Sequence, residues 1–470
     1  VVITGASRTD EGLVLPSHMA ADVVTASFGS GQVLTSALGT GHAVLDQVTA
    51  SGTRQTTSGD RIEVNFTPAP GKQSSAGKEA ASKSQPGIAG ESAGTGNASE
   101  AMAQIESATV DGNVVLVEEP SRGPGSEPRP PLRATAGHAE YEGREERLHL
   151  TVSPRVENGA LQLTAEKVDV LQASGDAFAH GSVKATWAPG AAGNGGAGKK
   201  QPGAPSGPGG GALGGEGPAH IVADEAQLHQ STGEATFRGQ VRLWEQANSI
   251  AAPEIVLNRS RQTLVARSPN GTSPVRVVML SAGGMDTLRA GQPGTPSSSA
   301  EGAGSMGHRG TSTQGATLGT GASPSVIRVR GAELKYSEAE RKAVMNGGAT
   351  GSVVAETGTA TSISKELELV LLPPGNHAGK DGAAAQVDRM TASGDVVVSS
   401  QGRRGTGNRL VYSSETGEYV LTGTAAAPPR MTDPAHGNVT GASLIFNSRD
   451  DSVSIEGGGS KTSSETMAPK

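Results

Sequence analysis

A 17-residue spacing recurs along this chain and constrains its fold more than any other feature. Each copy opens with Gly or Ala, closes with Gly, and carries mostly apolar residues at its positions 4, 6, 13 and 15. Side chains alternate between the two faces of a strand, so each apolar pair lies on one face. Every copy therefore predicts a β-hairpin with a polar turn at its centre. The ungapped copies are residues 165–181, 223–239, 331–347, 407–423 and 441–457.

Two further copies are split by inserted residues. Residues 59–66 match a first half and 104–112 the second half, and 364–371 pairs in the same way with 386–394. In both cases the insertion falls at the turn, where a hairpin tolerates length because loop-closure entropy grows slowly. This placement indicates that the repeat is structural. Looser copies occur at 21–37, 136–152 and 252–268.

The glycine that closes a copy is often followed directly by another strand-like run. Such runs occupy 112–117, 181–187, 239–244 and 394–399. A small residue suits a bend or bulge. We expect the chain to turn at these glycines from one layer of β-structure into the next.

Composition favours a thin, repetitive β-structure. The chain has 470 residues, of which 68 are Gly and only 34% are hydrophobic, so large compact cores are not expected. Stacked repeats need fewer large side chains, because each packs mainly on its neighbours. We predict one elongated array, interrupted by Gly- and Pro-rich loops that cannot bury enough apolar surface to order. The predicted parts are hairpin repeats at 19–187 with an insert at about 67–101, a linker at 188–218, repeats at 219–288, a low-complexity linker at 289–324, C-terminal repeats at 325–458 with an insert at about 373–385, and a polar tail at 459–470.

Charge and cysteine content exclude several classes of function. The net charge is −7 with no basic block, which argues against nucleic acid as a partner, because phosphate binding needs clustered Lys and Arg. The absence of Cys excludes disulfides and thiolate metal sites. No run of about 20 apolar residues is available to span a membrane as a helix. The sequence begins at Val1, so a signal peptide or membrane tether would precede it.

No motif in the sequence indicates an enzyme. Residues 193–200 (GNGGAGKK) have the glycine and lysine spacing of a P-loop but lack the Ser or Thr that reaches magnesium. The ten His are scattered without HxxxH or HExxH spacing, and no GxSxG elbow occurs. We therefore expect no catalytic residue, no metal site and no cofactor.

The remaining signal is a ladder of apolar side chains at equivalent positions of the copies. Stacked hairpins would place these residues on one continuous inner face. Two interpretations stay open: the face lines an apolar groove, or it fills a closed core without a ligand. The candidate groove residues are Val168, Val170, Phe178, Leu228, Phe237, Val241, Ile255, Leu257, Leu264, Leu334, Tyr336, Met345, Leu410, Tyr412, Leu421, Leu444, Phe446 and Ile455.

Residues 220–266 carry a more specific pattern. It consists of "AD.A", a turn, "A.F.G.V", "I.A..I.L" and "Q.L.A", and residues 407–458 add "LTG", "PP" and "VTGASL.F". In these segments the chain resembles the organic-solvent-tolerance-like domain of the periplasmic lipopolysaccharide-transport proteins, the OstA/LptA family. The matching residues of the first segment are Ala223, Asp224, Ala235, Phe237, Gly239, Val241, Ile250, Ala252, Ile255, Leu257, Gln262, Leu264 and Ala266.

This resemblance implies an all-β, antiparallel β-jellyroll or "β-taco" with an apolar interior. In the family that interior carries the acyl chains of lipopolysaccharide from inner to outer membrane, and subunits join edge to edge. The implied partners are lipopolysaccharide or a related glycolipid, an inner-membrane transport complex, an outer-membrane translocon with jellyroll domains, and further copies of the chain joined head to tail. The implied location is the periplasm. The alternatives are a structural or adhesive surface solenoid without lipid, and a carbohydrate-active solenoid enzyme.

Overall fold

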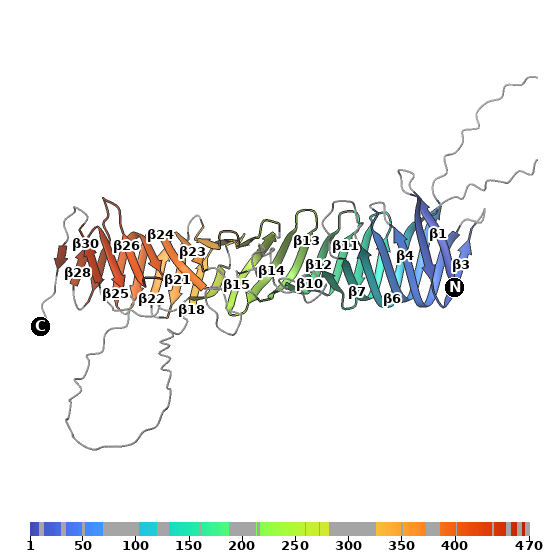
Figure 1. The fold of residues 1–470 in the computed structure, drawn as a ribbon, viewed down its shortest axis with the longest axis horizontal. Helices are drawn as coiled ribbons and strands as arrows, with labels where there is room; N and C mark the ends of the chain where they lie inside the picture. Colours follow the sequence, from blue (N-terminus) through green and yellow to red (C-terminus); the bar gives the residue numbers. More distant parts are fainter. Residues whose placement is uncertain are drawn as a thin grey trace, which may run out of the picture. The chain divides into compact units, whose positions relative to one another are not determined.

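The computed structural model shows an all-β protein. It describes residues 1–8, 14–29, 34–48, 52–68, 103–119, 131–159, 161–187, 213, 217–258, 260–271, 273–281, 326–348, 351–358, 360–372, 386–400, 402–434, 437–447, 453–457 and 463–465. These residues form strands β1 to β31 joined by turns and short connections (Figure 1). Within the described ranges, no helix is long and apolar enough to cross a membrane.

The chain divides into two compact units. Among the described residues, unit 1 contains Val1–Thr186 and Glu225–Ser231, and unit 2 contains the others. The strands of unit 1 are β1 (Val2–Arg8), β2 (Val14–Ala20), β3 (Val23–Phe28), β4 (Leu34–Val48), β5 (Arg54–Pro68), β6 (Ala103–Glu119), β7 (Leu132–Glu142), β8 (Arg147–Thr151), β9 (Arg155–Asn158), β10 (Leu161–Thr164), β11 (Lys167–Leu171), β12 (Asp176–Trp187) and the later part of β13 (Ala219–His229).

Unit 2 contains the remaining strands. They are β14 (Glu234–Glu245), β15 (Asn248–Asn258), β16 (Thr263–Arg267), β17 (Val275–Ser281), β18 (Val326–Gly331), β19 (Glu333–Ser337), β20 (Lys342–Asn346), β21 (Val353–Thr357), β22 (Ala360–Ser364), β23 (Glu366–Leu371), β24 (Gln386–Ser400), β25 (Arg403–Ser413), β26 (Glu418–Thr422), β27 (Arg430–Asp433), β28 (Gly437–Thr440), β29 (Ser443–Asn447), β30 (Val453–Glu456) and β31 (Ser463–Glu465).

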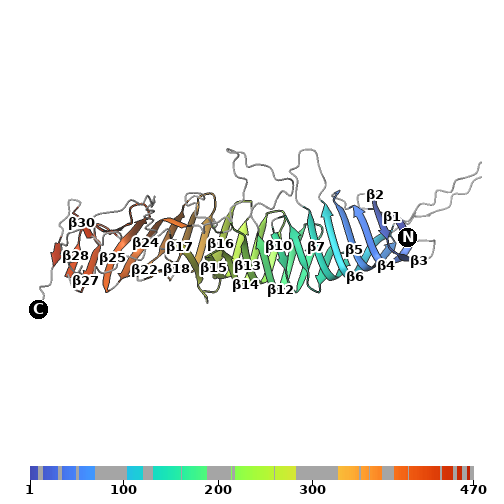
Figure 2. The same cartoon turned by 60° about the horizontal axis from the view of Figure 1, so that its bottom comes forward.

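Four of the five ungapped copies form the predicted hairpins. Strands β11 and β12, β19 and β20, β25 and β26, and β29 and β30 pair antiparallel within their copies. The split copies also pair, β5 with β6 and β23 with β24. Successive hairpins then hydrogen-bond to each other, as β16 does with β19 and β26 with β29. The repeat therefore describes the building unit of the fold, and Figure 2 shows the strands of unit 2 running side by side.

The long strands of each unit turn a corner at the glycines that the sequence marks. Strand β14 pairs with β15 up to Arg238 and resumes at Val241, with a bulge between them. Gly239 has φ of 97° in this bulge, a conformation that L side chains rarely adopt. An added Cβ would also overlap the carboxylate of Asp224, which accepts a hydrogen bond from the Gln240 amide at 3.3 Å. Asp224, the acidic residue of the "AD" in the sequence pattern, thus stabilises the corner.

The same corner occurs in unit 1. Strand β6 is bulged between Asp111 and Val114, and Gly112 has φ of 71°. The carboxylate of Asp60 lies under Gly112 and accepts a hydrogen bond from Asn113 Nδ2 at 3.0 Å. The same arrangement, an acidic side chain in contact with a positive-φ glycine, therefore recurs at these corners. At each of them a single strand bends from one wall of its unit into the other.

In unit 1 the inner faces of the walls combine small residues with Val, Ile and Leu. A methyl group added at Gly39 would lie 3.1 Å from Ala21 Cβ and 3.3 Å from Met19 Cε, so the interior at this end is filled by direct packing. Cross-strand pairing continues the inner face through the unit. The paired residues are Gly39, Ile62, Val110, Ala139, Leu150, Val168 and Ala179.

Some strands were not predicted. Strand β1 and most of β2 precede the first block expected at residue 19. They pair with each other, and β2 also pairs with β4. Strand β31 lies in the expected polar tail and pairs with β28. The short, polar sequence of β31 carries no alternation, so its strand conformation comes from the backbone of β28 that it extends. Most of the segments 67–101, 289–324 and 373–385 lies outside the described residues.

Candidate functional site

The first wall of unit 2 carries two unbroken rows of inward side chains. It consists of the first part of β14 and the second part of β15, then β16, β19, β20, β23, the first part of β24, the second part of β25, β26, β29 and β30. Residues directly opposite in an antiparallel ladder share a face. The row nearer the corner, the first-wall corner row, is Phe237, Ile255, Ala266, Leu334, Met345, Leu367, Ala392, Leu410, Leu421, Leu444 and Ile455.

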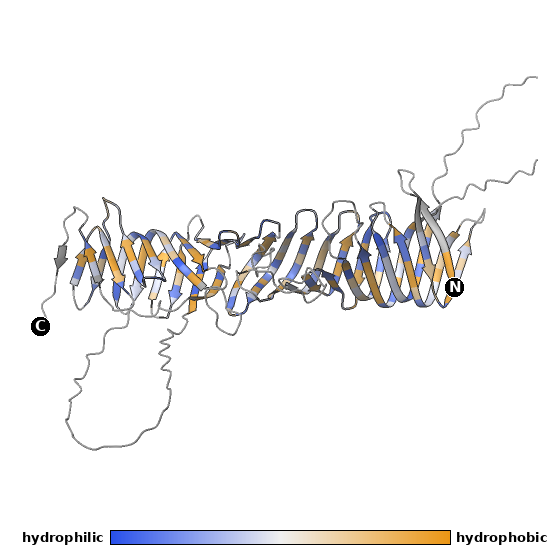
Figure 3. Ribbon diagram, in the orientation of Figure 1, coloured by the Kyte–Doolittle hydropathy of each residue, from blue (hydrophilic) through white to orange (hydrophobic). Residues whose placement is uncertain are grey.

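The second row of this wall lies farther from the corner, toward the hairpin turns. We call it the first-wall rim row. Its side chains are also apolar or aromatic along the whole of the unit, and Figure 3 shows apolar and polar residues alternating along these strands. The row contains Ala235, Leu257, Leu264, Tyr336, Ala343, Leu369, Met390, Tyr412, Tyr419 and Phe446.

The second wall of unit 2 changes in character along its length. Its middle row begins with Leu243, Ile250, Val277 and Val329 and continues with Ala355, Ser362, Val398, Gly405 and Met431. The second-wall rim row runs from Met279 and Ile327 to Thr357, Ala360, Ser400 and Arg403. From β21 onward, small and polar residues replace most of the large apolar ones, with Val398 and Met431 as exceptions.

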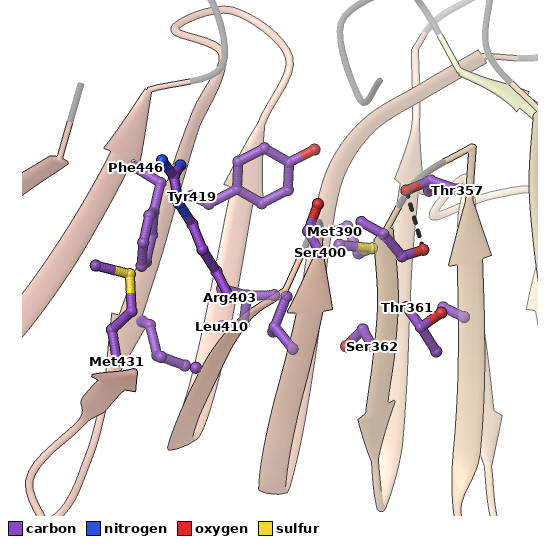
Figure 4. A pocket seen from close by; sticks show the side chains of 15 residues that line it. Thr357, Thr361, Ser362, Met390, Ser400, Arg403, Leu410, Tyr419, Met431 and Phe446 are labelled. Carbon is purple, nitrogen blue, oxygen red and sulfur yellow. Dashed lines mark hydrogen bonds between the residues drawn. The ribbon is translucent and has the colours of Figure 1, made fainter. Parts of the chain in front are cut away.

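That change opens a hollow between the two walls. The hollow holds about 840 Å³ of space not occupied by protein atoms, including the part open to solvent (Figure 4). Met390, Leu410 and Tyr419 line it from the first wall. Opposite them lie residues without large side chains, such as Ala355 and Gly405. The hollow therefore exists because bulky residues on one wall face small residues on the other.

Polar side chains gather at the second-wall side of this hollow. Arg403 Nε donates to Asp433 Oδ2 at 2.9 Å, and the Asp433 side chain is only 9% exposed. Thr357 Oγ1 donates to the Ala360 carbonyl at 3.5 Å. The hydroxyls of Ser362 and Ser400 are buried and have no hydrogen-bond partner among the described residues. The hollow is thus apolar on one wall and carries hydrogen-bonding groups on the other.

A second, smaller cavity of about 440 Å³ lies nearer the start of unit 2. Ile250, Val329 and Leu369 are among its lining residues. Leu213 also lines it, is 5% exposed, and has its amide bonded to Glu245 Oε2 at 2.8 Å. The expectation that the whole of 188–218 is a loop without packing is therefore wrong at Leu213. Leu213 is buried because a mainly apolar cavity accepts its side chain.

The rims of the two walls are joined near this smaller cavity. The end of β17, which continues the second wall, pairs in parallel with the start of β24, which continues the first. Leu280 pairs with Gln386 and Ser281 with Val387, and Val387 is fully buried. The interior of unit 2 is therefore bridged at β17 and β24.

Most of the predicted groove residues lie on the inner faces of their units. Those of unit 2 fall in the first-wall rows or, for Val241, next to the corner, and nearly all are buried. Phe446 and, in unit 1, Leu228 are half-buried, and Ile455 is 38% exposed on the last strand of its wall. The buried members are Val168, Val170, Phe237, Val241, Ile255, Leu257, Leu264, Leu334, Tyr336, Met345, Leu410, Tyr412, Leu421 and Leu444.

Phe178 is a correction. It pairs with Asp169, whereas the inward Val168 and Val170 pair with Ala179 and Ala177. Phe178 therefore lies on the outer face of β12, where its ring meets His229 edge-on at 6.5 Å between centroids. The sequence argument preferred the large side chain, but the alternation assigns the inner positions to its small neighbours.

Several lining residues were missed. Leu367, Leu369 and Met390 all line the cavities, and the second wall contributes Ala355 and Gly405. The first three occupy positions 4, 6 and 13 of the split copy 364–371 with 386–394, so the repeat already carried the signal. Ala355 and Gly405 could not be found in this way, because Ala and Gly do not produce an alternating hydrophobic pattern in the sequence.

Burial also shapes the chemistry of the inner face. Burial raises the pKa of the Tyr336 phenol far above its ordinary value, and its hydrogen bond to the Glu338 carboxylate raises the pKa further. Tyr336 is thus a neutral donor in the first-wall rim row. In the part of the chain that the structure describes, no group of three or more His, Asp or Glu is placed to hold a metal ion.

The chain was compared with known families, curated proteins and solved structures. Residues 220–451, which make up most of unit 2, match the model of a family described as "LptA/(LptD N-terminal domain) LPS transport protein". Among solved structures, the chain is similar to LptH of Pseudomonas aeruginosa, described as the LptA-homologous periplasmic component of the lipopolysaccharide transport device. The identity is 16% and the TM-score 0.23, covering 30% of this chain and 86% of that one. No curated protein matches the chain.

Proposed function

We propose that this protein binds lipopolysaccharide or a related glycolipid through its acyl chains, in the groove between the two walls of unit 2. The observation that carries the proposal is the unbroken pair of apolar rows on the first wall, which borders a hollow of about 840 Å³. Transfer of one CH₂ from water to an apolar site is worth about 0.8 kcal/mol. A ligand with several acyl chains is therefore held strongly without any specific polar contact.

Equivalent apolar positions on successive strands suit a ligand that moves along the groove. Neighbouring positions such as Leu410, Leu421 and Leu444 offer similar surfaces one strand apart, about 4.8 Å. An acyl chain that shifts by one strand loses one set of apolar contacts and gains a similar set. Its binding free energy is therefore similar at neighbouring positions, and it is not held at one of them. We infer that unit 2 acts as a segment of a periplasmic conduit toward the outer membrane rather than as an enzyme, with no cofactor.

The exposed edge strands suit the partners that such a conduit needs. Within the described residues, β30 pairs with β29 alone and β31 with β28 alone, so each leaves one edge open. An open edge can be extended by a strand of another jellyroll. We propose that an inner-membrane complex, an outer-membrane translocon or a second copy of this chain docks in this way. The family match of residues 220–451 supports this proposal.

Site-specific photo-crosslinking in cells tests the function. A photoreactive residue at Leu421, in the first-wall corner row, should capture lipopolysaccharide. The matched control is Val420, the next residue on the same strand, whose side chain points to the other face. Capture at Leu421 but not at Val420 is expected. Equal capture at both positions, or none at Leu421, would instead favour a structural solenoid without a lipid ligand.

A further inference from the structure

The hollow of unit 2 contains two serine hydroxyls that have nothing to bond. Ser362 is 8% exposed and Ser400 is 4% exposed, and the Oγ atoms of both lack a hydrogen-bond partner among the described residues. Both residues line the hollow (Figure 4). Buried hydroxyls are normally bonded, so two unsatisfied ones in one hollow call for an explanation.

The neighbouring hydroxyls show that this is specific to the two serines. Ser364, two residues farther along β22, donates to the Glu366 carbonyl at 2.9 Å. Thr357, on the adjacent strand β21, donates to the Ala360 carbonyl at 3.5 Å. Local backbone acceptors therefore satisfy these nearby hydroxyls, whereas those of Ser362 and Ser400 are buried beside the hollow and have no partner among the described residues.

Ser362 and Ser400 lie at different distances from the rim of the second wall. Ser400 belongs to the second-wall rim row, where it pairs with Ala360 and Arg403. Ser362 pairs with Val398 in the middle row, one step closer to the corner. The two serines are diagonal neighbours on adjacent strands β22 and β24, a relation in which Cα atoms are about 7–8 Å apart. Both can therefore reach one short polar segment of a ligand that enters from the rim.

The first wall, opposite the serines, indicates that the rest of the ligand is apolar. Met390, Leu410, Tyr419 and Leu421 present apolar surface to the hollow from the first wall. A purely polar ligand would leave this surface without contacts, and a plain alkyl chain would leave both hydroxyls desolvated and unpaired. The complementary ligand is an alkyl chain that bears an oxygen substituent close to its head.

We propose that the hollow selects hydroxylated acyl chains, with Ser362 and Ser400 donating hydrogen bonds to the hydroxyl oxygen of the chain or to the oxygen of an ester formed on it. This proposal rests on the proposed function, because it names which acyl chains the groove prefers. A hydroxyl that finds its partner in the complex is worth about a tenfold gain in affinity over a chain that lacks one.

Two fatty acids that differ by one hydroxyl provide the test. The affinities of the whole protein for 3-hydroxytetradecanoic acid and tetradecanoic acid are measured by calorimetry below the concentrations at which either forms micelles. Their carboxylates are identical, so any effect of Arg403 cancels in the ratio. We expect the hydroxylated acid to bind about tenfold more tightly.

Variants assign the preference to the serines. The double variant Ser362→Ala, Ser400→Ala should bind the two acids equally, while Ser400→Thr, which keeps a hydroxyl, should retain a preference. Ser399→Ala is the matched control, because Ser399 is exposed and lies on the other face of β24. Circular dichroism confirms that each variant is folded. A wild type that binds both acids equally well, or an unchanged ratio in the double variant, would overturn the proposal. Failure to bind either acid would instead count against the lipid groove itself.

Discussion

Leu410 on β25 lies directly opposite Leu421 on β26, and Gly405 faces this pair from the second wall. A methyl group added at Gly405 would come within 3.2 Å of Leu421 Cδ2, the far end of a flexible side chain. The width of the hollow at this rung is therefore set by the absence of a side chain at one residue. Gly405 does not have a positive φ, so a larger residue can adopt its backbone conformation.

Gly405→Leu should close the groove without unfolding the protein. The new side chain would occupy the hollow beside Leu421, so loading of radiolabelled lipopolysaccharide should fall at least tenfold. The thermal unfolding midpoint should change by a few degrees at most, since the side chain fills existing space. Thr406→Leu is the control, because Thr406 pairs with Val397 on the outer face of the same strands. Normal loading in Gly405→Leu would show that lipid does not pass this rung.

The buried side chain of Leu213, a residue of the Gly-rich linker, belongs to the core of unit 2. Leu213→Ala removes a side chain that is 5% exposed and enlarges the smaller cavity, so unit 2 should lose about 2–4 kcal/mol of stability. Urea denaturation followed by near-ultraviolet circular dichroism measures this loss. Leu213→Met, which keeps most of the volume, should cost less than about 1.5 kcal/mol. Equal stability of wild type and Leu213→Ala would mean that the anchor contributes nothing.

The carboxylate of Asp169 should make unit 1 sensitive to acid. Burial acts most strongly and raises the pKa of Asp169, but the hydrogen bond from His149 at 2.6 Å and the interaction with Lys167 at 3.1 Å together outweigh burial and hold this pKa below its ordinary value. A carboxyl with a depressed folded-state pKa stabilises the fold above its unfolded pKa, and this stabilisation is lost as the pH falls through the folded value. The contribution is therefore complete above about pH 5 and declines below about pH 4.

Asp169→Asn provides the comparison. The variant should be less stable than wild type near neutral pH, and the difference should shrink as the pH falls below about 4, because the wild-type carboxyl also becomes neutral. Urea midpoints measured across this range show the effect. Glu106→Gln, an exposed position on β6, is the control that should leave the profile unchanged. A stability difference independent of pH would exclude this electrostatic origin.

The sequence predicted the first wall far better than the second. Leu334, Leu410 and Leu444 recur at one position of the repeat, and a period of two places them on one face whatever the tertiary context. The second wall is made partly of Ala355 and Gly405, and small residues do not reveal which face they occupy. Its polar groups are also invisible in the pattern, because a serine on an inner face looks like any turn or surface serine.

Other differences came from tertiary contacts that no local pattern records. Leu213 is ordered because a cavity accepts it, although its flanking sequence is typical of a linker. Phe178 is displaced to the outer face because register, not size, decides orientation. Strand β31 forms on a polar sequence because β28 offers a free edge. Local propensity yields to pairing in each case.

A double-mutant cycle of Gly239 and Asp224 tests whether the "AD" pattern forms the corner at Gly239. Gly239→Ala places a Cβ at φ of 97° and against the Asp224 carboxylate, so it should destabilise unit 2 by about 2 kcal/mol or more. Asp224→Ala alone should cost about 1 kcal/mol, through loss of the hydrogen bond from the Gln240 amide.

The two changes should not be additive. Removing the Asp224 side chain relieves the overlap but not the strained φ, so the double variant should recover part of the loss caused by Gly239→Ala. Urea unfolding of all four proteins gives the coupling free energy, expected at about 0.5–1.5 kcal/mol in the direction of rescue. A coupling of zero would show that the acidic residue beneath the glycine does not form the corner, and that the "AD" pattern has another cause.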